Sequence, residues 1–423
     1  MTANFWKRGA IPKRILIALL LFSGPLFAQT KATRAGHLID PASGTVANNQ
    51  VIVIQGGKIT AVGANVPVPA GAEVIDLSNA WVMPGLMDAH THLTYGVAPG
   101  PFALIDNYLS EGSGLRALHG ARNAKDMLEA GFTAVKDIGN DANYAAVDLR
   151  RAIERGWVPG PSMLTTGKII AAFGGQSNGV PPELGPYWRF EYIDADTPDE
   201  IRKAVRQNIY YGANAIKLVA DNNRYVYSEA EIRAAAEEAH AAGVTLAVHV
   251  QGGQAARNVI LGGADSIEHG FGLSDELLTL MKEKGTVLAG TEFPAAHFKA
   301  MQYGADGGAK LAAQIVDRLR RAYRIGVKLV FSTDIVVELP GENRGEMALD
   351  YLDGWTQAGI PPKDILKCMT TNVAELFRWK GKRGAIATGE AADIIATPAN
   401  PLENIQALRK VQFVMKDGKI VKK

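Results

Sequence analysis

The chain has 423 residues, of which 47% are hydrophobic, and a formal charge of +2. This length exceeds the size at which most single cores divide, unless the fold is an α/β barrel with additions, and the apolar content excludes a disordered protein. The small charge gives no basic excess for holding nucleic acid, and the single cysteine, Cys368, excludes an internal disulfide.

Residues 1–28 have the composition of a secretory signal peptide. Basic residues up to Arg14 precede the apolar run Ile15–Phe22, and the helix-breaking segment 23–25 leads to Ala28. The run is too short to span a bilayer comfortably, and a small residue suits cleavage, although a retained membrane anchor is the alternative. Removal of this segment takes away four basic side chains and no acid, so the formal charge changes from +2 to −2. We expect export to the periplasm or the extracellular space.

Both ends of the chain have the pattern of short strands joined by turns. Near the N-terminus the apolar run Val51–Ile54 leads through Gly56-Gly57 into a second apolar run, which is a hairpin signal. Ala392–Ala396 begins a similar pattern near the C-terminus. Neither end has enough strands for a core of its own. We therefore expect one small β-sandwich, built from residues 29–84 and 382–423.

Between residues 85 and 381, apolar strands alternate with amphipathic helices. Eight strands are predicted, within 81–93, 132–137, 163–166, 215–219, 245–250, 266–269, 286–290 and 328–334. Such alternation implies a parallel sheet, and eight units imply a closed (β/α)8, or TIM, barrel; a doubly wound open sheet is the alternative. No dinucleotide-binding or P-loop glycine pattern opens any of the helices. The predicted class is therefore α/β, with residues 85–381 as the barrel.

Polar side chains that suit metal binding stand at the ends of five of these strands. They are His90 and His92 on the first strand, Lys217 on the fourth, His249 on the fifth, His269 on the sixth and Asp334 on the eighth. The active site of a barrel lies at this end of its strands. Imidazole and carboxylate are metal ligands, and a buried lysine is costly unless it is modified or paired. Each residue alone could be a satisfied core residue, but together they predict a metal site.

The sequence resembles the amidohydrolase superfamily, in the branch with two metal ions bridged by a carboxylated lysine. The matching segments are Pro84–His92, Lys217, His249, His269, Ser332–Asp334, Met369–Ala374 and Lys382–Ile394. The resemblance extends from about residue 33 to the end. It implies six metal-binding residues: His90, His92 and Asp334 for a buried ion, His249 and His269 for a more exposed ion, and Lys217, as a carbamate, for both. Two divalent ions are expected, zinc by default for these ligands.

The resemblance also implies hydrolysis of an amide or related C–N bond. The two ions would lower the pKa of a bridging water, and Asp334 would take its proton and pass it to the leaving nitrogen. Similar members of the superfamily act on dipeptides and N-acyl amino acids, as prolidase-like carboxypeptidases or ochratoxin-type amidases. We therefore expect a metal-dependent amidohydrolase for a small peptide or N-acyl amino acid. A homo-oligomer, from dimer to octamer, is implied; a nucleic-acid partner and a stable membrane anchor are not.

Two rivals remain open. One is a cyclic-amide hydrolase of the imidazolonepropionase or lactamase type. The other is a structural relative that has lost its metal and acts by assembly, but here all six ligand positions are filled. A deaminase fits less well, because mononuclear deaminases lack the bridging lysine.

Three further residues are candidates for binding substrate. Tyr227 precedes a Ser-x-x-Glu helix start, where peptidases of this superfamily carry a tyrosine that polarises the substrate carbonyl, so its hydroxyl would act as an oxyanion donor. Arg224 has the geometry to pair with a substrate carboxylate. A solvated loop ahead of a helix cap is the alternative for both. His297, on the loop after the seventh strand, either faces the pocket or lies on the surface.

The long connection Ala171–Asp194 is rich in glycine, proline and aromatic residues. Long loops on this face of a barrel are often lids or substrate walls, and a subunit contact is the alternative. Gln176 stands where relatives often have the histidine of a Gly-Gly-His turn, so a substrate contact by that histidine is not expected here. Gly175–Gly179 matches a serine-hydrolase elbow, but Val180-Pro181-Pro182 prevents the helix that the elbow requires.

Overall fold

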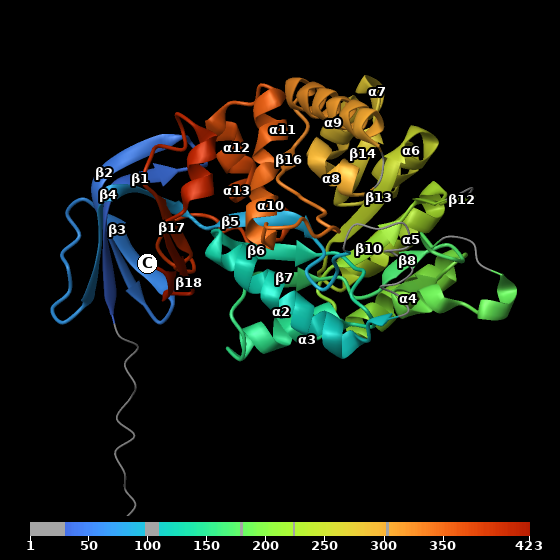
Figure 1. The fold of residues 1–423 in the computed structure, drawn as a ribbon, viewed down its shortest axis with the longest axis horizontal. Helices are drawn as coiled ribbons and strands as arrows, with labels where there is room; N and C mark the ends of the chain where they lie inside the picture. The colour runs from blue at the N-terminus through green and yellow to red at the C-terminus, as the bar shows by residue number, and fades with distance from the viewer. Residues whose placement is uncertain (1–29, 98–109, 178–180, 223–224, 302–303) are drawn as a thin grey trace, which may run out of the picture.

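The structure is a computed structural model that describes residues 30–97, 110–177, 181–222, 225–301 and 304–423 (Figure 1). The predicted signal peptide and Arg224 lie outside these residues. One sheet is formed by the two ends of the chain, and two parallel sheets lie between them in sequence. No helix within the described residues is long and apolar enough to cross a membrane.

The two ends of the chain meet in a single seven-stranded sheet, ordered β19-β18-β17-β4-β1-β2-β3. Its strands are β1 (Lys31–Asp40), β2 (Thr45–Gln55), β3 (Lys58–Gly63), β4 (Glu73–Pro84), β17 (Ile394–Thr397), β18 (Phe413–Lys416) and β19 (Lys419–Lys422). The junction is antiparallel, with Ile394 of β17 opposite Pro84 of β4 (Figure 1). Buried side chains from both ends, including Ile52 and Phe413, share one apolar cluster. The predicted pairing of the two ends is therefore present, while their arrangement as a sandwich stays a prediction.

The central part of the chain contains parallel strands in two sheets, β5-β6-β7 and β16-β15-β14-β13-β10-β8-β9. The strands are β5 (Leu86–Thr91), β6 (Phe132–Asp137), β7 (Ser162–Thr165), β8 (Ile169–Ala171), β9 (Tyr192–Asp194), β10 (Ile216–Val219), β13 (Leu246–Gly252), β14 (Ser266–Gly272), β15 (Val287–Ala289) and β16 (Leu329–Val330). Backbone hydrogen bonds link both edges of the three-stranded sheet to the larger sheet: Ala89 N, in β5, donates to Phe331 O next to β16 (2.9 Å), and Ala215 N, next to β10, donates to Thr165 O in β7 (3.2 Å). The α/β class is confirmed, and these bonds are of the kind that a closed barrel needs.

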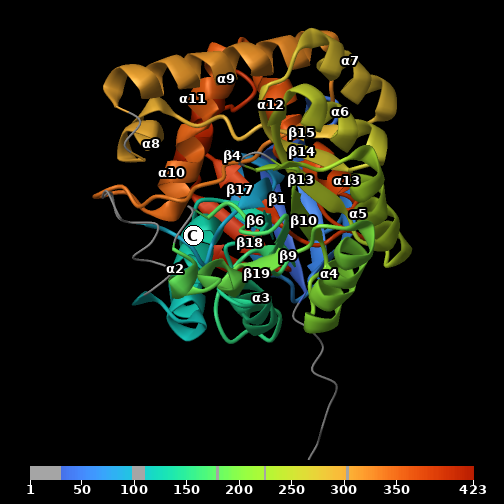
Figure 2. The same cartoon turned by 90° about the vertical axis from the view of Figure 1, so that its right-hand side faces the viewer.

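Helices surround the parallel strands (Figure 2). They are α2 (Ser113–Glu129), α3 (Ala145–Glu154), α4 (Pro198–Tyr211), α5 (Glu229–Ala241), α6 (Gly253–Gly262), α7 (Asp275–Lys284), α8 (Ala295–Ala300), α9 (Ala305–Ile325), α10 (Arg344–Asp350), α11 (Leu352–Gln357), α12 (Pro362–Cys368) and α13 (Thr371–Leu376). Several begin where the sequence supplies a cap: the Thr197 side chain accepts from Glu200 N, and Ser228 and Glu231 form a capping box. Such caps fix where each helix leaves the strand before it.

The described parts of the connection between residues 171 and 194 include regular secondary structure. It contains two 3₁₀ turns, η1 (Pro182–Leu184) and η2 (Tyr187–Phe190), and β9 runs parallel to β8 at the edge of the sheet. The aromatic side chains divide between two environments. Trp188 and Tyr192 are buried against Ile169 and Val219, whereas Phe173 is exposed. Most of the apolar content of this connection therefore stabilises the sheet edge.

Candidate metal centre

His90 and His92, the predicted ligands on the first strand, lie close to Asp334, the predicted carboxylate ligand that follows the last strand. The Oδ1 atom of Asp334 lies 3.0 Å from Nε2 of His92 and 3.2 Å from Nε2 of His90. The two Nε2 atoms are 3.3 Å apart. Asp334 is held there by its own backbone, because its N–H donates to the carbonyl of His90 (2.8 Å).

The outer nitrogen of each ring is already engaged. Nδ1 of His90 contacts Oε2 of Glu268 (2.8 Å), and Nδ1 of His92 contacts the carbonyl of Gly139 (2.7 Å). Since a neutral imidazole has one N–H, donation through Nδ1 leaves Nε2 as a lone pair on both rings. Two lone pairs and a carboxylate oxygen directed at one point are a suitable donor set for a divalent cation. The residues present therefore fit the expected metal.

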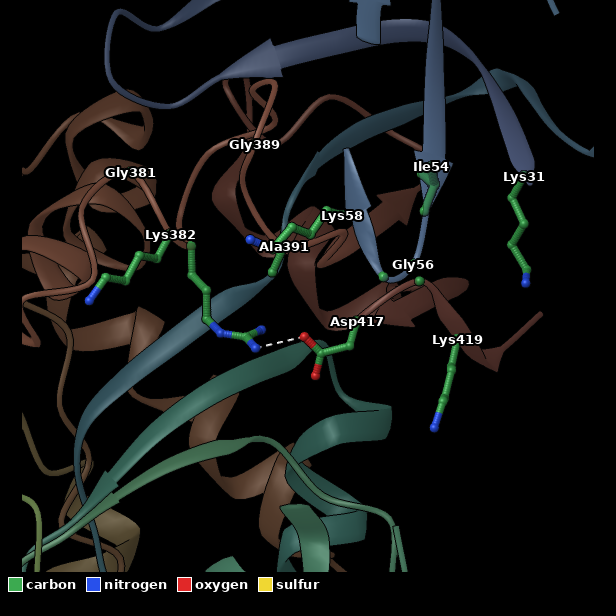
Figure 3. Close-up of a pocket in the computed structure, with 13 residues that line it drawn as sticks. Lys31, Ile54, Gly56, Lys58, Gly381, Lys382, Gly389, Ala391, Asp417 and Lys419 are labelled. Atoms are coloured by element: carbon green, nitrogen blue, oxygen red, sulfur yellow. Dashed lines mark hydrogen bonds and ion pairs between the residues drawn. The ribbon is translucent and has the colours of Figure 1, made fainter. Parts of the chain in front are cut away.

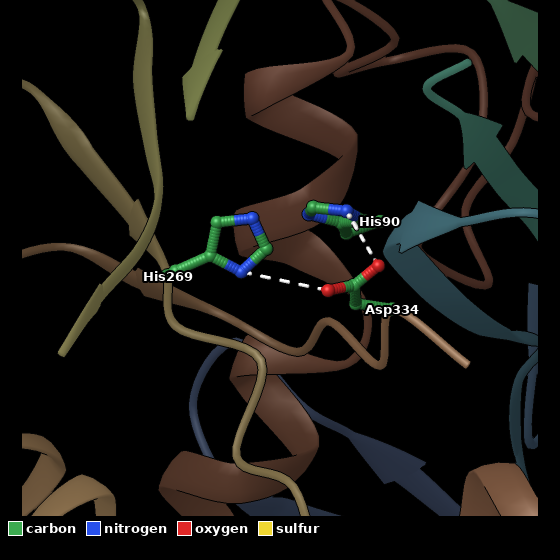
Figure 4. Close-up of side chains that lie close together, drawn as sticks. All are labelled: His90, His269 and Asp334. Carbon is green, nitrogen blue, oxygen red and sulfur yellow. Dashed lines mark ion pairs between the residues drawn. The ribbon is translucent and has the colours of Figure 1, made fainter. Parts of the chain in front are cut away.

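His269 completes the cluster of His90, His269 and Asp334, whose potential ligand atoms all lie within 4.8 Å of one another (Figure 4). Its Nδ1 lies 2.9 Å from the hydroxyl of Thr291 and 3.5 Å from Oδ2 of Asp334. The backbone at His269 is left-handed, with φ of +70°, which interrupts the alternation of β14. Both Glu268 and His269 consequently reach the centre from one strand.

His249 lies beside this cluster, with its ring centre 4.4 Å from that of His269. Its Nε2 atom is 3.4 Å from the amide nitrogen of Gln176 and 3.9 Å from Oδ1 of Asp221. Burial and the nearby Lys217 lower the pKa of His249 to about 3, and burial lowers the pKa of His269 well below its ordinary value. Both rings are therefore neutral near pH 7, the form that ligates metal.

Lys217 is buried in β10, with 2% of its surface exposed. Burial lowers its pKa to about 8, against the opposing effects of Glu268 and Asp334. A measurable fraction of the side chain is therefore a neutral amine near pH 7, which is the form that reacts with carbon dioxide. The pKa of Lys217 is therefore influenced by the charges of Glu268 and Asp334, and Asp334 is another predicted ligand.

Sequence reasoning missed several residues that support the centre. Lys136, in β6, is as buried as Lys217, and its Nζ lies 3.5 Å from Oε1 of Glu268. Burial alone would raise the pKa of Glu268, but Lys136 and His90 hold it at about 2. Asp88 accepts from the backbone N–H of His90 (3.0 Å). A signal existed for Lys136, because Phe132–Asp137 is an apolar strand with a lysine inside, as around Lys217.

Two of the three residues predicted to bind substrate, Tyr227 and His297, are buried and contact other parts of the protein. The hydroxyl of Tyr227 is buried and donates to the backbone carbonyl of Ala195, so it must leave that bond before it can donate to a substrate. His297 is fully buried rather than on the surface, with Nδ1 3.2 Å from the hydroxyl of Tyr351, and burial lowers its pKa to about 4. Arg224 is outside the described residues.

An aromatic row leads away from His269. The ring of Phe271, which is partly exposed, lies 5.7 Å from that of His269, and the ring of Phe293 lies 6.4 Å further along. Phe293 in turn contacts Phe298 and Tyr351 at 5.3 and 5.7 Å. One side of the centre is therefore apolar.

A separate hollow of about 730 Å³ lies in the terminal sheet, away from these residues (Figure 3). Lys31, Lys58, Lys382 and Lys419 line it, but Lys382 points to the opposite side of the hollow from Lys31 and Lys419. Its Arg383 is paired with Asp417 at 2.6 Å. The charges do not converge on one point, so this hollow is no rival to the metal centre.

Comparison with known proteins identifies the family of this chain. Residues 81–421 match the profile of the amidohydrolase family. An ochratoxinase of Aspergillus niger is 29% identical over 432 residues, covering 92% of this chain and 86% of that protein. The crystal structure of a Xaa-Pro dipeptidase with bound methionine superposes with a TM-score of 0.81 and 29% identity, covering 93% of this chain and all of that chain. An imidazolonepropionase of Fusobacterium nucleatum is 25% identical, covering 89% and 92% of the two chains. The chain belongs to the amidohydrolase family.

Proposed function

We propose that this protein is a metal-dependent hydrolase that cleaves the amide bond of small peptides or N-acyl amino acids. The observation that carries the proposal is the convergence of two imidazole nitrogens on one carboxylate oxygen, at 3.0 and 3.2 Å from Asp334. The kinship with an ochratoxinase and a Xaa-Pro dipeptidase supports an amide substrate with an amino-acid part. Kinship with an imidazolonepropionase is more distant, so a cyclic amide is the second candidate.

The proposed centre holds two divalent ions, with zinc the first choice for this ligand set. His90, His92 and Asp334 would hold one, His249 and His269 the other, and Lys217, carboxylated, would contact both. When bound, such ions lower the pKa of a water molecule and polarise the carbonyl of a substrate. Carboxylation would also convert the buried cation of Lys217 into an anion, which removes the cost of leaving it unpaired.

Asp334 is the proposed general base and acid. Burial would raise its pKa, but His90 and His92 hold that pKa well below its ordinary value, so the carboxylate is ionised and able to accept a proton. Its Oδ1 faces these two histidines, which leaves Oδ2, 3.5 Å from His269, as the oxygen that takes the proton from the attacking water. The same oxygen then returns the proton to the leaving nitrogen.

The surroundings support a substrate with one apolar group and one polar end. The row of Phe271 and Phe293 would contact an apolar side chain, since aromatic rings pack favourably against apolar and aromatic groups. Arg224 is the proposed partner of the substrate carboxylate. Tyr227 is the proposed hydrogen-bond donor to the substrate carbonyl, once its hydroxyl has left the carbonyl of Ala195. His297 is buried beneath the aromatic row, so its proposed contribution to substrate binding is made through that row and not from a solvent-exposed position.

We further propose a closed (β/α)8 barrel, a terminal β-sandwich, export directed by residues 1–28 and a homo-oligomeric state. The backbone bonds between the two parallel sheets support closure. The basic and apolar segments ahead of Ala28 support export. The oligomer is proposed by analogy with relatives, and its test is the mass of the mature protein in solution.

Metal content and turnover test the function together. The purified protein would be analysed for bound metal and assayed on Xaa-Pro dipeptides, N-acyl phenylalanines and cyclic amides, before and after chelation and metal return. About two ions per chain and chelator-sensitive release of an amino acid are expected. Turnover of cyclic amides alone would support the second candidate, a cyclic-amide hydrolase. Absence of both bound metal and turnover would exclude both candidate functions.

In the same assay Asp334→Asn separates proton transfer from metal binding. The amide keeps an oxygen for the metal but is a poor base, so we expect much of the metal to remain while kcat falls by at least about 100-fold. Substantial remaining activity would exclude Asp334 as the base.

A further inference from the structure

Three of the four ligand histidines have their outer nitrogen fixed by an oxygen. Nδ1 of His90 meets Glu268 at 2.8 Å, Nδ1 of His92 meets the carbonyl of Gly139 at 2.7 Å, and Nδ1 of His269 meets the hydroxyl of Thr291 at 2.9 Å. The carboxylate and the carbonyl only accept, so they select the tautomer of His90 and His92 with the proton on Nδ1, and all three contacts fix the plane of the ring.

His249 differs, because the polar groups beside its ring lie near Nε2 rather than Nδ1. They are the amide nitrogen of Gln176 at 3.4 Å and Oδ1 of Asp221 at 3.9 Å. Nδ1 of His249 has no hydrogen-bond partner among the described residues. Whichever group takes the proton of Nε2 therefore decides whether Nδ1 is a lone pair, able to bind metal, or an N–H, unable to do so.

Asp221 has one satisfied and one unsatisfied oxygen. Its Oδ2 accepts from the backbone N–H of Gln251 (2.7 Å), whereas Oδ1 is buried without a hydrogen-bond partner in the described part of the chain. A buried oxygen without a partner is costly, so its presence calls for an explanation. Among the described residues, the histidine nitrogen that lies near it is Nε2 of His249, at 3.9 Å.

The backbone fixes this juxtaposition. Val219 of β10 is paired with His249 of β13, and Ala220 N donates to the carbonyl of His249 (2.9 Å). Asp221 follows directly, so its carboxylate is carried beside the imidazole by two neighbouring strands. The 3.9 Å between Nε2 of His249 and Oδ1 of Asp221 is about 1 Å longer than an ordinary N–H···O hydrogen bond.

Gln176 is the competing partner and is the weaker one. Its side chain is exposed, and its other end meets the hydroxyl of Tyr192 only at 3.5 Å. A carboxamide can present either its oxygen or its N–H₂, whereas a carboxylate is only an acceptor. A hydrogen bond to an ionised acceptor is also about twice as strong as one between neutral groups.

We propose that Asp221 accepts the proton of Nε2 of His249 and thereby presents Nδ1 as the lone pair that faces the metal centre. Asp221 is a positioning residue, which acts on His249 as Glu268 acts on His90. It stands four residues after Lys217, so one strand end supplies both a ligand and the group that orients the next ligand. The inference rests on the proposed function only in that His249 serves as a ligand.

The tautomer itself is the direct test. Protein labelled with ¹⁵N-histidine and stripped of metal would be examined by NMR at pH 7.5, with the signals of His249 assigned by their loss in His249→Gln. We expect His249 to carry its proton on Nε2 in the wild type. In Asp221→Asn the oxygen of the new amide must still accept the hydrogen bond from the N–H of Gln251. The NH₂ group of that amide then faces Nε2 of His249, so the proton of His249 should move from Nε2 to Nδ1. A wild-type His249 protonated on Nδ1 would overturn the proposal, whether or not the protein is active.

Metal affinity gives the second readout. Titration with chelators of graded strength should show that Asp221→Asn binds one of the two ions about 10- to 100-fold more weakly, the range typical of such outer partners. Gln176→Ala, the matched control, should bind both ions as the wild type does. Equal affinities in Asp221→Asn and wild type would exclude Asp221 from this role. If the wild type shows the expected tautomer of His249 but cleaves none of the proposed substrates, the proposed function is excluded and the proposed role of Asp221 is still supported.

Discussion

Asp88 and Thr333 lie 245 positions apart in sequence and are joined by two hydrogen bonds. The hydroxyl of Thr333 donates to Oδ2 of Asp88 (2.7 Å), and its backbone N–H donates to Oδ1 (3.2 Å). Oδ1 also accepts from the N–H of His90 (3.0 Å). One buried carboxylate therefore joins the strand that carries His90 to the segment that carries Asp334.

Asp88→Ala should destabilise the fold and disperse the ligands. It would remove the acceptor that three buried donors share, and the two donors of Thr333 would keep only their longer contacts with the carbonyl of His90 (3.3 and 3.4 Å). We therefore expect the free energy of unfolding to fall by about 1–3 kcal/mol. Weaker metal retention should accompany this loss. Urea unfolding and metal analysis after dialysis measure the two effects.

Asp88→Asn is the control for that experiment, because the amide keeps one oxygen in the same place. It should lose clearly less stability than the alanine variant. Equal losses in the two variants would mean that the hydrogen bonds to Thr333 and His90 contribute little.

The ligand positions could be predicted because each follows an apolar strand. Lys217 and His249 interrupt buried runs where a polar side chain has no other reason to stand, and the parallel arrangement brings such strand ends together. The helix starts at Thr197 and Ser228 were equally predictable from their caps. The local sequence pattern thus predicted the α/β class of the fold and the positions of the candidate ligands.

The groups that orient the ligands could not be predicted. Glu268 contacts His90 across 178 positions, and the partner of His92 is a backbone carbonyl, which has no sequence signature. The left-handed backbone at His269 and Asp334 could not be predicted from the sequence either, because glycine is the residue that usually indicates this conformation. Tertiary contacts decide all of these features.

Lys217→Ala should lose metal and recover part of its activity with added short carboxylates. The small acid would supply the oxygen ligand that the proposed carbamate of Lys217 would provide in the wild type. Metal analysis and turnover with and without acetate or propionate measure this rescue. A fully active Lys217→Ala would contradict the bridging-carbamate model.

Lys136→Ala is the matched control, since Lys136 is an equally buried strand lysine next to the same Glu268. Its ammonium is a counter-charge rather than a ligand, so its loss should not be rescued by carboxylates. Rescue of both variants alike would point to a general effect of the added acid.

A buried ion pair ties the 171–194 connection to α2. Arg116 donates to Oε1 of Glu191 with both side chains inaccessible, and Oε2 of Glu191 accepts from Asn140 (2.5 Å). Arg116→Met leaves the carboxylate without its cation, which should cost about 3–5 kcal/mol of unfolding free energy. The double variant Arg116→Met/Glu191→Leu should be more stable than Arg116→Met alone, as measured by urea unfolding. A double variant that loses the sum of the two single losses would show that the pair is not coupled.

Asp141 should make stability depend on pH in the direction opposite to an ordinary paired carboxylate. Burial raises its pKa to about 7, and Asp137 adds to the shift. Because the folded pKa lies above the unfolded one, the folded state retains a proton that the unfolded chain releases. The stabilisation is full below about pH 4 and is lost as the pH rises through about 7.

Asp141→Asn should remove this dependence, since a neutral amide can still accept from Tyr144 N, which lies 3.3 Å from Oδ1. The variant should gain on the order of 3 kcal/mol relative to wild type between pH 4 and pH 8, as measured by urea unfolding at each pH. Asp137 is retained in both proteins, so the difference between them reports the titration of Asp141 together with its coupling to Asp137. Asp148→Asn, at an exposed position on α3, controls for the loss of one negative charge. If the variant and wild type lose stability in parallel as the pH rises, Asp141 does not bind the extra proton in the folded state.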